Sequence, residues 1–235
     1  MLSNLTPVAK NLLIINIVCF IGSMIFKDAT MLFGVFYPDS PFFQIWQPIT
    51  YMFMHGGLGH IFFNMFALVM FGPVIEQILG SKRFLNYYLI CGLGALVLQY
   101  GVQAIEVYNI AGTVRAHSLI SFDMFNNSIS GTAGLSQADF NTLASIYATP
   151  MVGASGAIYG LLLAFGYFFP NRELMLIFVP VPVKAKYFIP ILIVIELVLA
   201  FTQSGSSIAH LAHVGGALFG YLLIKAWGIK RPNFY

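Results

Sequence analysis

Residues 153–169 read GASGAIYGLLLAFGYFF, an apolar segment that contains no charged side chain. A run of this kind is typical of a membrane-spanning helix, because only a helix satisfies its own backbone hydrogen bonds in lipid. The segment opens with Gly153, Ala154, Ser155 and Gly156. Few structural roles need a hydroxyl flanked by glycines within lipid, so this segment indicates nucleophilic chemistry in the bilayer.

The composition of the whole chain agrees with a membrane protein. Of its 235 residues, 59% are hydrophobic and 8% are charged, whereas about 25% are charged in ordinary soluble domains. The net charge of +3 is small and spread over loops, which argues against a nucleic-acid partner and favours membrane lipid. The only cysteines, Cys19 and Cys91, lie in apolar runs, so we expect no disulfide framework.

The hydrophobic pattern predicts an all-α membrane protein with six transmembrane helices in a single domain over residues 1–235. The spans are expected at about residues 11–26, 59–79, 85–107, 152–169, 187–203 and 207–227. The first run lacks the Ala-x-Ala pattern of a cleaved signal peptide, so we interpret it as an uncleaved first helix. An even number of spans leaves both termini on one side of the membrane.

The distribution of basic residues predicts the orientation, because Lys and Arg accumulate on the cytoplasmic side. Only Lys27 and Arg115 fall on the side opposite the termini. The side of the termini holds Lys10, Lys82, Arg83, Arg172, Lys184, Lys186, Lys225, Lys230 and Arg231. We therefore expect an integral multi-pass protein of a cell (inner) membrane with both termini cytoplasmic. To the outer connection over residues 108–151 we assign no chemistry.

Ser155 is expected slightly below the outer membrane surface. It precedes Arg172, the inner boundary of the span, by 17 residues, which is about 25 Å of helix in a hydrocarbon core about 30 Å thick. Pro150 and Gly153 come just before it, so we expect the helix to begin inside the membrane. The unpaired amide groups of a helix start could there hold an oxyanion.

His213 is the base expected beside Ser155. It precedes Lys225 by 12 residues, which places it in the same outer half of the membrane. A serine hydroxyl needs such a base to become a nucleophile. Tyr159, one helical turn below Ser155, is expected to pack against the imidazole and fix its plane.

Two pairs of glycines predict that the fourth and sixth spans pack closely. Gly156 and Gly160 form a GxxxG pair on one span, and Gly216 and Gly220 form another on the face of His213. Such faces let helix backbones approach each other. The spacing would bring His213 to Ser155, although GxxxG pairs and small residues in membrane helices also serve packing alone.

The second span adds two polar side chains near its outer end. His60 and Asn64 are four residues apart and therefore share one helix face. An imidazole and an amide can both donate hydrogen bonds to a tetrahedral oxyanion. His55, which precedes Gly56 and Gly57, is expected to brace the loop before this span.

Taken together, these residues resemble the motifs of rhomboid-family intramembrane serine proteases. The resemblance implies a six-helix bundle, a Ser155/His213 dyad without a carboxylate, an oxyanion site of His60, Asn64 and the Ser155 amide, and cleavage of transmembrane protein substrates. It implies supporting roles for Gly153, Gly156, Tyr159, Gly216, Gly220 and His55, and a structural role for Glu76 at the inner end of the second span. One difference lies in the first outer connection. Many relatives have Trp-Arg there, whereas in this chain Trp46 is followed by Gln47, so the resemblance does not say how this loop is anchored.

Other chemistries are weighed against this prediction. A zinc protease would need a His-Glu-x-x-His helix, and this sequence has none. An aspartyl protease would need two membrane-buried aspartates, whereas all four aspartates lie in predicted loops. His60, His210 and His213 could ligate a metal, but no carboxylate or thiolate at the same depth is expected to complete the set. We therefore predict neither a metal nor a cofactor.

Two further hypotheses stay open. A proton-coupled transporter would use Glu196 with the histidines as a relay, and a catalytically silent relative would only bind membrane helices. Glu196 lies near the middle of the fifth span, so we expect it to face other helices or water and to be hydrogen-bonded, with a role in helix packing. The sequence sets no oligomeric state.

Overall fold

Each of the six predicted spans folds as a helix. The computed structural model describes residues 5–123, 126, 128–176, 179–202 and 207–231. The helices that match the spans are α1 (Pro7–Ile25), α4 (Leu58–Leu79), α5 (Ser81–Ala111), α7 (Ser155–Phe168), α8 (Ala185–Thr202) and α9 (Ser207–Ala226). Residue 203, the predicted end of the fifth span, lies outside the described residues, as do both ends of the predicted 1–235 domain.

Three helices among the described residues have the length and hydropathy that a membrane crossing needs, namely α1, α4 and α5. Helix α7 is apolar but has only 14 residues, which is about 21 Å against a hydrocarbon core of about 30 Å. Its shortness agrees with a helix that begins inside the membrane. That the chain crosses the membrane six times stays a prediction.

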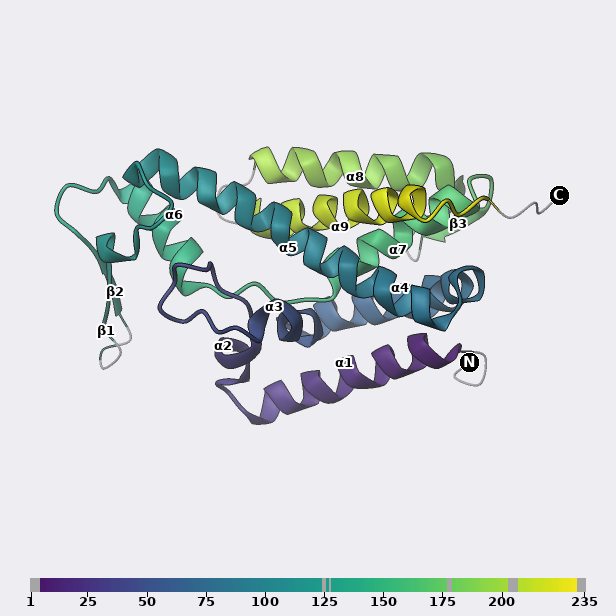
Figure 1. The fold of residues 1–235 in the computed structure, drawn as a ribbon, viewed down its shortest axis with the longest axis horizontal. Coiled ribbons are helices and arrows are strands. Elements are labelled where there is room, and N and C mark those ends of the chain that lie inside the picture. Colours follow the sequence, from purple (N-terminus) through teal and green to yellow (C-terminus); the bar gives the residue numbers. More distant parts are fainter. Residues whose placement is uncertain (1–4, 124–125, 127, 177–178, 203–206, 232–235) are drawn as a thin grey trace.

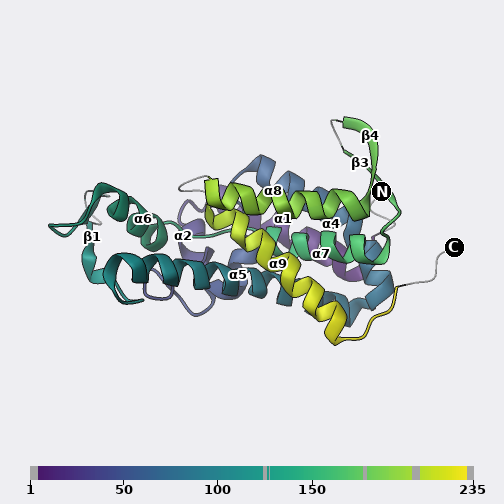
Figure 2. The same ribbon diagram turned by 90° about the horizontal axis from the view of Figure 1, so that it is seen from above.

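Helix α7 lies at the centre of the bundle, in contact with α4, α5, α8 and α9, while α1 packs on α4. Figure 2 shows α8 and α9 side by side in front of α7. In Figure 1 the starts of α1 and α8, the ends of α7 and α9 and the α4–α5 junction all lie at one end of the bundle. These are the segments that carry most of the Lys and Arg residues, as the charge pattern predicts.

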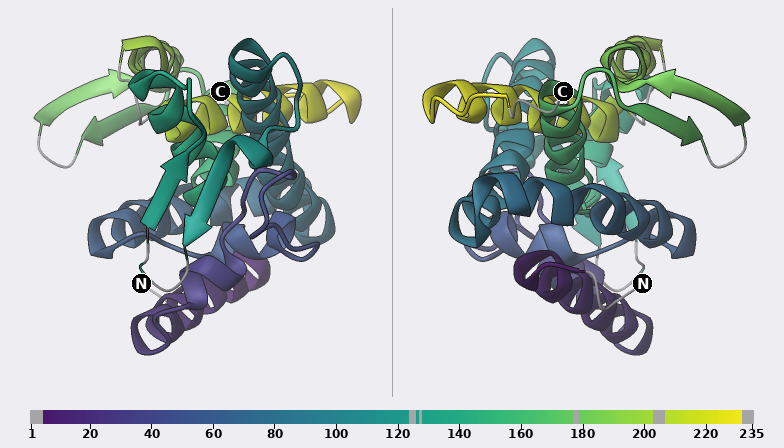
Figure 3. Two further views of the ribbon diagram at one scale, coloured as in Figure 1. Left: turned by 90° about the vertical axis from the view of Figure 1, so that its left-hand side faces the viewer. Right: turned by 90° about the vertical axis from the view of Figure 1, so that its right-hand side faces the viewer.

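The connections contain short elements that the hydrophobic pattern did not predict. The first outer connection holds α2 (Ala29–Phe33), α3 (Gln47–Thr50) and the 3-10 turn η2 (Tyr51–Phe53); the second holds η3 (His117–Leu119), β1 (Ile120–Asp123), β2 (Ser128–Gly131) and α6 (Gln137–Ala148). A second hairpin, β3 (Glu173–Leu176) with β4 (Val179–Lys184), projects to the side of the bundle in Figure 3. Both hairpins are antiparallel. The all-α prediction is correct for the bundle and misses these hairpins, because span-length hydrophobicity does not report on strands of four to six residues.

Large apolar side chains cover the outward faces of the helices. They are exposed on α1, α4, α8 and α9 and include Ile14, Val18, Ile21, Phe62, Phe63, Phe66, Ile191, Val194, Val198, Leu218 and Leu222. Soluble monomers rarely expose apolar patches larger than a few hundred Å². A lipid environment accounts for this surface, so the protein is an integral membrane protein.

Glu76 joins α1 to the start of α5 at the inner end of α4. Its buried carboxylate accepts hydrogen bonds from the Thr6 hydroxyl at 2.5 Å and the Ser81 hydroxyl at 2.6 Å. It also accepts from the backbone amides of Val8 at 3.1 Å and Ala9 at 2.9 Å, which are unpaired donors of the first turn of α1. The structural role that the resemblance implies for Glu76 agrees with these contacts.

Gln47 anchors the first outer connection from within. Its side chain is fully buried, its Oε1 accepts from the Gln44 amide at 3.0 Å, and its Nε2 donates to the Phe42 carbonyl at 3.0 Å. The neighbouring Trp46 indole donates to the Leu32 carbonyl at 3.0 Å. The neutral side chain of Gln47 therefore anchors the loop through local backbone groups, and the arginine that many relatives have at this position is not needed.

Asp39 ties the two outer connections together. Its Oδ2 accepts from the Tyr147 hydroxyl at 2.9 Å and lies 3.2 Å from both the backbone nitrogen and Nδ1 of His117. Burial would raise the pKa of Asp39, but the hydrogen bonds from Tyr147 and His117 outweigh it and lower that pKa. The 108–151 connection is thus packed against the first one rather than free of it.

Replacing Glu76 by alanine is expected to destabilise the fold, because four donors lose their buried acceptor. We expect the free energy of unfolding to fall by about 3 kcal/mol. Thermal denaturation of the purified protein in detergent measures it. Glu173→Gln, which neutralises an exposed carboxylate on β3, is the matched control; equal melting temperatures for all three proteins would show that Glu76 does not hold α1.

Candidate active site

The backbone that leads into α7 is held in place from two sides. Met151 forms an isolated antiparallel bridge with Val35, and the Gly153 amide donates to the Tyr51 carbonyl at 2.9 Å. Gly153 has a φ of 130°, a conformation that L side chains rarely adopt, and a Cβ there would lie 2.8 Å from the imidazole of His60. Glycine is therefore required at this position, and α7 begins at Ser155, three residues after the predicted start of the span at residue 152.

Ser155 and His213 meet between α7 and α9. The Ser155 Oγ lies 2.8 Å from the His213 Nε2, although the residues are 58 positions apart in the chain. Both side chains are half-buried. When the hydroxyl donates to Nε2, the neutral ring must carry its proton on Nδ1.

Glycine contacts bring these two helices together, as the sequence predicts. A Cβ on Gly216 would overlap the carbonyl group of Gly156, and one on Gly220 would lie 3.2 Å from the Cα of Gly160. Helix α5 closes the third side, where the Tyr87 hydroxyl donates to the Gly160 carbonyl at 2.8 Å. The sequence analysis did not predict this contribution of α5.

Tyr159 stacks on the imidazole of His213. The ring centroids are 4.3 Å apart and the planes differ by 5°, which confirms the predicted packing. The Tyr159 hydroxyl donates to Glu196 on α8. The tyrosine thus restrains the plane of the imidazole and reaches a carboxylate beyond it.

Glu196 lies next to the candidate base. Its buried Oε2 is 2.5 Å from the Nδ1 of His210 and 3.0 Å from the Nδ1 of His213, although the His213 N–H is not aligned as a hydrogen bond. The expectation that Glu196 faces other helices and is hydrogen-bonded is confirmed. The structure differs from the carboxylate-free dyad that the resemblance implied, because α8 turns this side chain toward α9.

The same three residues correct a second expectation. The ligand atoms of Glu196, His210 and His213 lie within 4.8 Å of one another, so a carboxylate does accompany two histidines at this depth. No carboxylate was expected beside these histidines, because the sequence of α8 does not indicate which of its faces turns toward α9. The nitrogens stand 2.5 and 3.0 Å from one shared oxygen, whereas tetrahedral zinc ligands stand about 3.3 Å apart. The spacing is that of a hydrogen-bonded cluster.

His60 and Asn64 face Ser155 from α4. The Gly56 amide donates to the His60 Nδ1 at 3.3 Å, so the proton of the neutral ring lies on Nε2. The Asn64 Nδ2 is buried and has no hydrogen-bond partner among the residues that the structure describes. Both groups are donors with capacity left for a ligand. His55 is buried with its ring at 67° to that of His60 and 5.1 Å away, which agrees with a bracing role.

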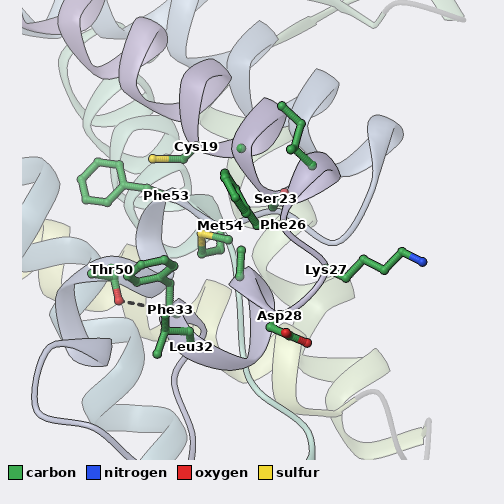
Figure 4. Close-up of a pocket in the computed structure, with 13 residues that line it drawn as sticks. Cys19, Ser23, Phe26, Lys27, Asp28, Leu32, Phe33, Thr50, Phe53 and Met54 are labelled. Carbon is green, nitrogen blue, oxygen red and sulfur yellow. Dashed lines mark hydrogen bonds between the residues drawn. The ribbon is translucent and has the colours of Figure 1, made fainter.

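These side chains line one cavity of about 620 Å³. His60, Asn64, Gly153, Ser155, Tyr159 and His213 all contribute to it, and residues 149–152 form part of its wall. A second cavity of about 670 Å³ lies at the outer end of α1 (Figure 4). Apart from the Lys27 and Asp28 side chains, which point away from it in the figure, its lining is mostly apolar and includes none of the residues above. The first cavity is therefore the candidate active site.

Comparison with known proteins identifies the family of this chain. The family model of the Rhomboid domain matches residues 43–229. The chain belongs to the rhomboid family. Rhomboid protease GluP of Bacillus subtilis is 27% identical over 191 residues, and Rhomboid protease AarA of Providencia stuartii is 27% identical over 192 residues. An uncharacterized mitochondrial rhomboid protein of Schizosaccharomyces pombe is 26% identical over 212 residues.

These alignments cover 77–81% of this rhomboid-family chain and 27–56% of the relatives. The chain thus spans about half or less of the length of each relative. The matched region nevertheless includes every residue of the candidate site, from His55 to Gly220.

Sequence reasoning located most of the site and missed the role of one residue. Glu196 was noticed as the carboxylate within a predicted span, yet nothing in the sequence related its face to His213. The rotation of a helix that is apolar on all sides is set by packing.

Proposed function

We propose that the protein is an intramembrane serine endopeptidase that hydrolyses peptide bonds in or near transmembrane segments of other membrane proteins. The observation that carries the proposal is the 2.8 Å contact between the Ser155 Oγ and the His213 Nε2 inside an apolar bundle. A hydroxyl is a weak nucleophile until an adjacent base takes its proton. Family membership and the names of two relatives support the same activity.

The proposed reaction follows from the positions of these groups. The Ser155 Oγ attacks the scissile carbonyl carbon as its proton passes to the His213 Nε2, and His213 then protonates the leaving amine. Water hydrolyses the acyl-enzyme through the same base. The cavity supplies the room for the substrate backbone and that water.

The oxyanion is proposed to be held by three donors. These are the His60 Nε2–H, the Asn64 Nδ2 and the Ser155 backbone amide in the first turn of α7. The unpaired state of the Asn64 amide supports this role, because a buried donor without a partner is unfavourable unless a ligand meets it. The dipole of α7 adds positive potential at the same point.

The proposed partners are transmembrane protein substrates and the surrounding lipid. We place the protein in a cell (inner) membrane with both termini in the cytoplasm, on the basis of the Lys and Arg bias. Because the site lies near the end of the bundle opposite these basic segments, substrates would be cut near the outer surface.

Proton-coupled transport is a second candidate, favoured by the cluster of Glu196, His210 and His213. It predicts proton flux into vesicles that does not depend on Ser155. A catalytically silent helix-binding protein would show neither flux nor cleavage. Both alternatives leave the alignment of Ser155 with His213 without a role.

Replacing either Ser155 or His213 by alanine is expected to lower cleavage of a transmembrane model substrate by about 10,000-fold or more. The reason is that nucleophile and base act as one unit. Gel-based cleavage assays with the purified protein in detergent or liposomes measure the effect. The matched control is Ser130→Ala, an exposed serine on β2 outside the cavity, and substantial cleavage by either site variant would exclude the Ser155/His213 mechanism.

Loss of single oxyanion donors is expected to leave measurable activity. His60→Ala and Asn64→Ala should each lower kcat about 100-fold, equivalent to about 3 kcal/mol of transition-state stabilisation. Asn141→Ala, which removes an exposed amide on α6, should have no effect. Wild-type kcat in both α4 variants would mean that α4 serves only as scaffold.

Metal removal is expected to leave cleavage unchanged, because the nitrogens of His210 and His213 already meet a carboxylate at hydrogen-bonding distances. Cleavage is measured before and after dialysis against EDTA. A loss of activity that added Zn²⁺ restores would instead assign Glu196, His210 and His213 as metal ligands.

A further inference from the structure

Helix α8 brings a buried carboxylate to the candidate base. Glu196 is only 7% exposed, and its two oxygens contact three side chains from two other helices. Oε1 accepts from the Tyr159 hydroxyl on α7, whereas Oε2 lies 2.5 Å from the His210 Nδ1 and 3.0 Å from the His213 Nδ1 on α9. A polar group placed for packing alone would not need this convergence.

The tautomer of His213 follows from the group that faces its Nδ1. A carboxylate can only accept a hydrogen bond, so Glu196 favours the neutral ring that carries its hydrogen on Nδ1, 3.0 Å away. In that tautomer Nε2 is free to accept the proton of the Ser155 hydroxyl, 2.8 Å away. A small rotation of the carboxylate or ring would align the 3.0 Å contact as a hydrogen bond.

The surroundings of His213 contain no second carboxylate among the described residues. The titratable groups that face it are His60 from α4, Tyr159 from α7, Glu196 from α8 and His210 from α9; α5 contributes Tyr87 and Cys91 to the same helix interface. Glu196 is thus the carboxylate nearest the ring. When His213 takes the serine proton, it becomes a cation inside an apolar bundle, where an uncompensated charge is strongly unfavourable.

We propose that Glu196 is a positioning residue for His213, so that the site works as a Ser155–His213–Glu196 triad. This inference rests on the proposed protease function and extends it. Glu196 holds the Nδ1 proton in place and neutralises the imidazolium that forms during serine attack. Tyr159 and His210 hold the carboxylate by hydrogen bonds, and Tyr159 also fixes the plane of the ring by stacking on it.

Glu196→Gln tests the proposal, because it keeps the size of the side chain and removes its charge. We expect kcat to fall at least about 10-fold while KM stays within about twofold, since substrate binding does not involve this residue. Glu106→Gln is the matched control: it neutralises another half-buried carboxylate, on α5, away from His213. Its kcat and KM should equal those of the wild type.

The split between kcat and KM separates positioning from packing. Loss of the charge beside His213 should lower kcat alone, whereas a packing defect would lower the melting temperature or change kcat and KM together. Wild-type kcat in Glu196→Gln would overturn the proposal.

Glu196→Asp keeps the test decisive if the glutamine variant folds poorly. It retains the charge at a slightly greater distance, so we expect an intermediate kcat. Identical kcat values in the aspartate and glutamine variants would overturn the proposal, because the charge would then have no effect. Activity is expressed per folded protein, as judged by thermal melting.

Failure of the inference differs from failure of the proposed function. If Ser155→Ala is inactive and Glu196→Gln behaves as wild type, the protease proposal stands and the triad is excluded. If Ser155→Ala cleaves normally, the protease proposal itself is excluded.

Discussion

The close approach of α7 and α9 is the constraint on which the rest of the structure depends. Gly156 and Gly216 allow the two backbones to touch, since a methyl group on Gly216 would overlap the carbonyl group of Gly156. Only at that separation can a serine on one helix and a histidine on the other meet at 2.8 Å. In lipid, helix association depends on packing and hydrogen bonds rather than on hydrophobic burial, so small residues set the geometry.

Buried polar groups fix the remaining helices around that pair. Glu76 binds the first turn of α1, Gln47 holds the outer connection, and Glu196 joins α8 to α7 and α9. Glu76 and Glu196 are met by groups from other helices, and Gln47 is met by backbone groups of its own connection. A polar group without a hydrogen-bond partner is strongly unfavourable in an apolar bundle. Few other arrangements of the surrounding segments would therefore satisfy these side chains. The polar groups therefore specify which helices meet, while apolar contacts supply most of the burial.

The position of Glu196 changes the interpretation of the site. The resemblance implies a dyad without a carboxylate, whereas here the His213 Nδ1 faces a carboxylate at 3.0 Å. The donors opposite it, on His60 and Asn64, retain free hydrogen-bonding capacity toward the cavity. The proposed nucleophile, base and oxyanion donors thus come from three helices, and the carboxylate from a fourth. The proposed site therefore depends on the position of α8.

The amino-acid sequence by itself determined the membrane environment, the helices, the glycine faces and the chemical identity of the candidate site residues. Those features depend on local hydrophobicity and on spacing along one helix, which the sequence contains directly. It predicted the contact between Ser155 and His213 only through paired glycines. Tertiary structure alone decided that Glu196 faces His213 and that Gln47 is buried in its loop. The reason is physical: on a helix that is apolar all round, no periodicity marks the inner face, so its rotation is set by the helices packed against it.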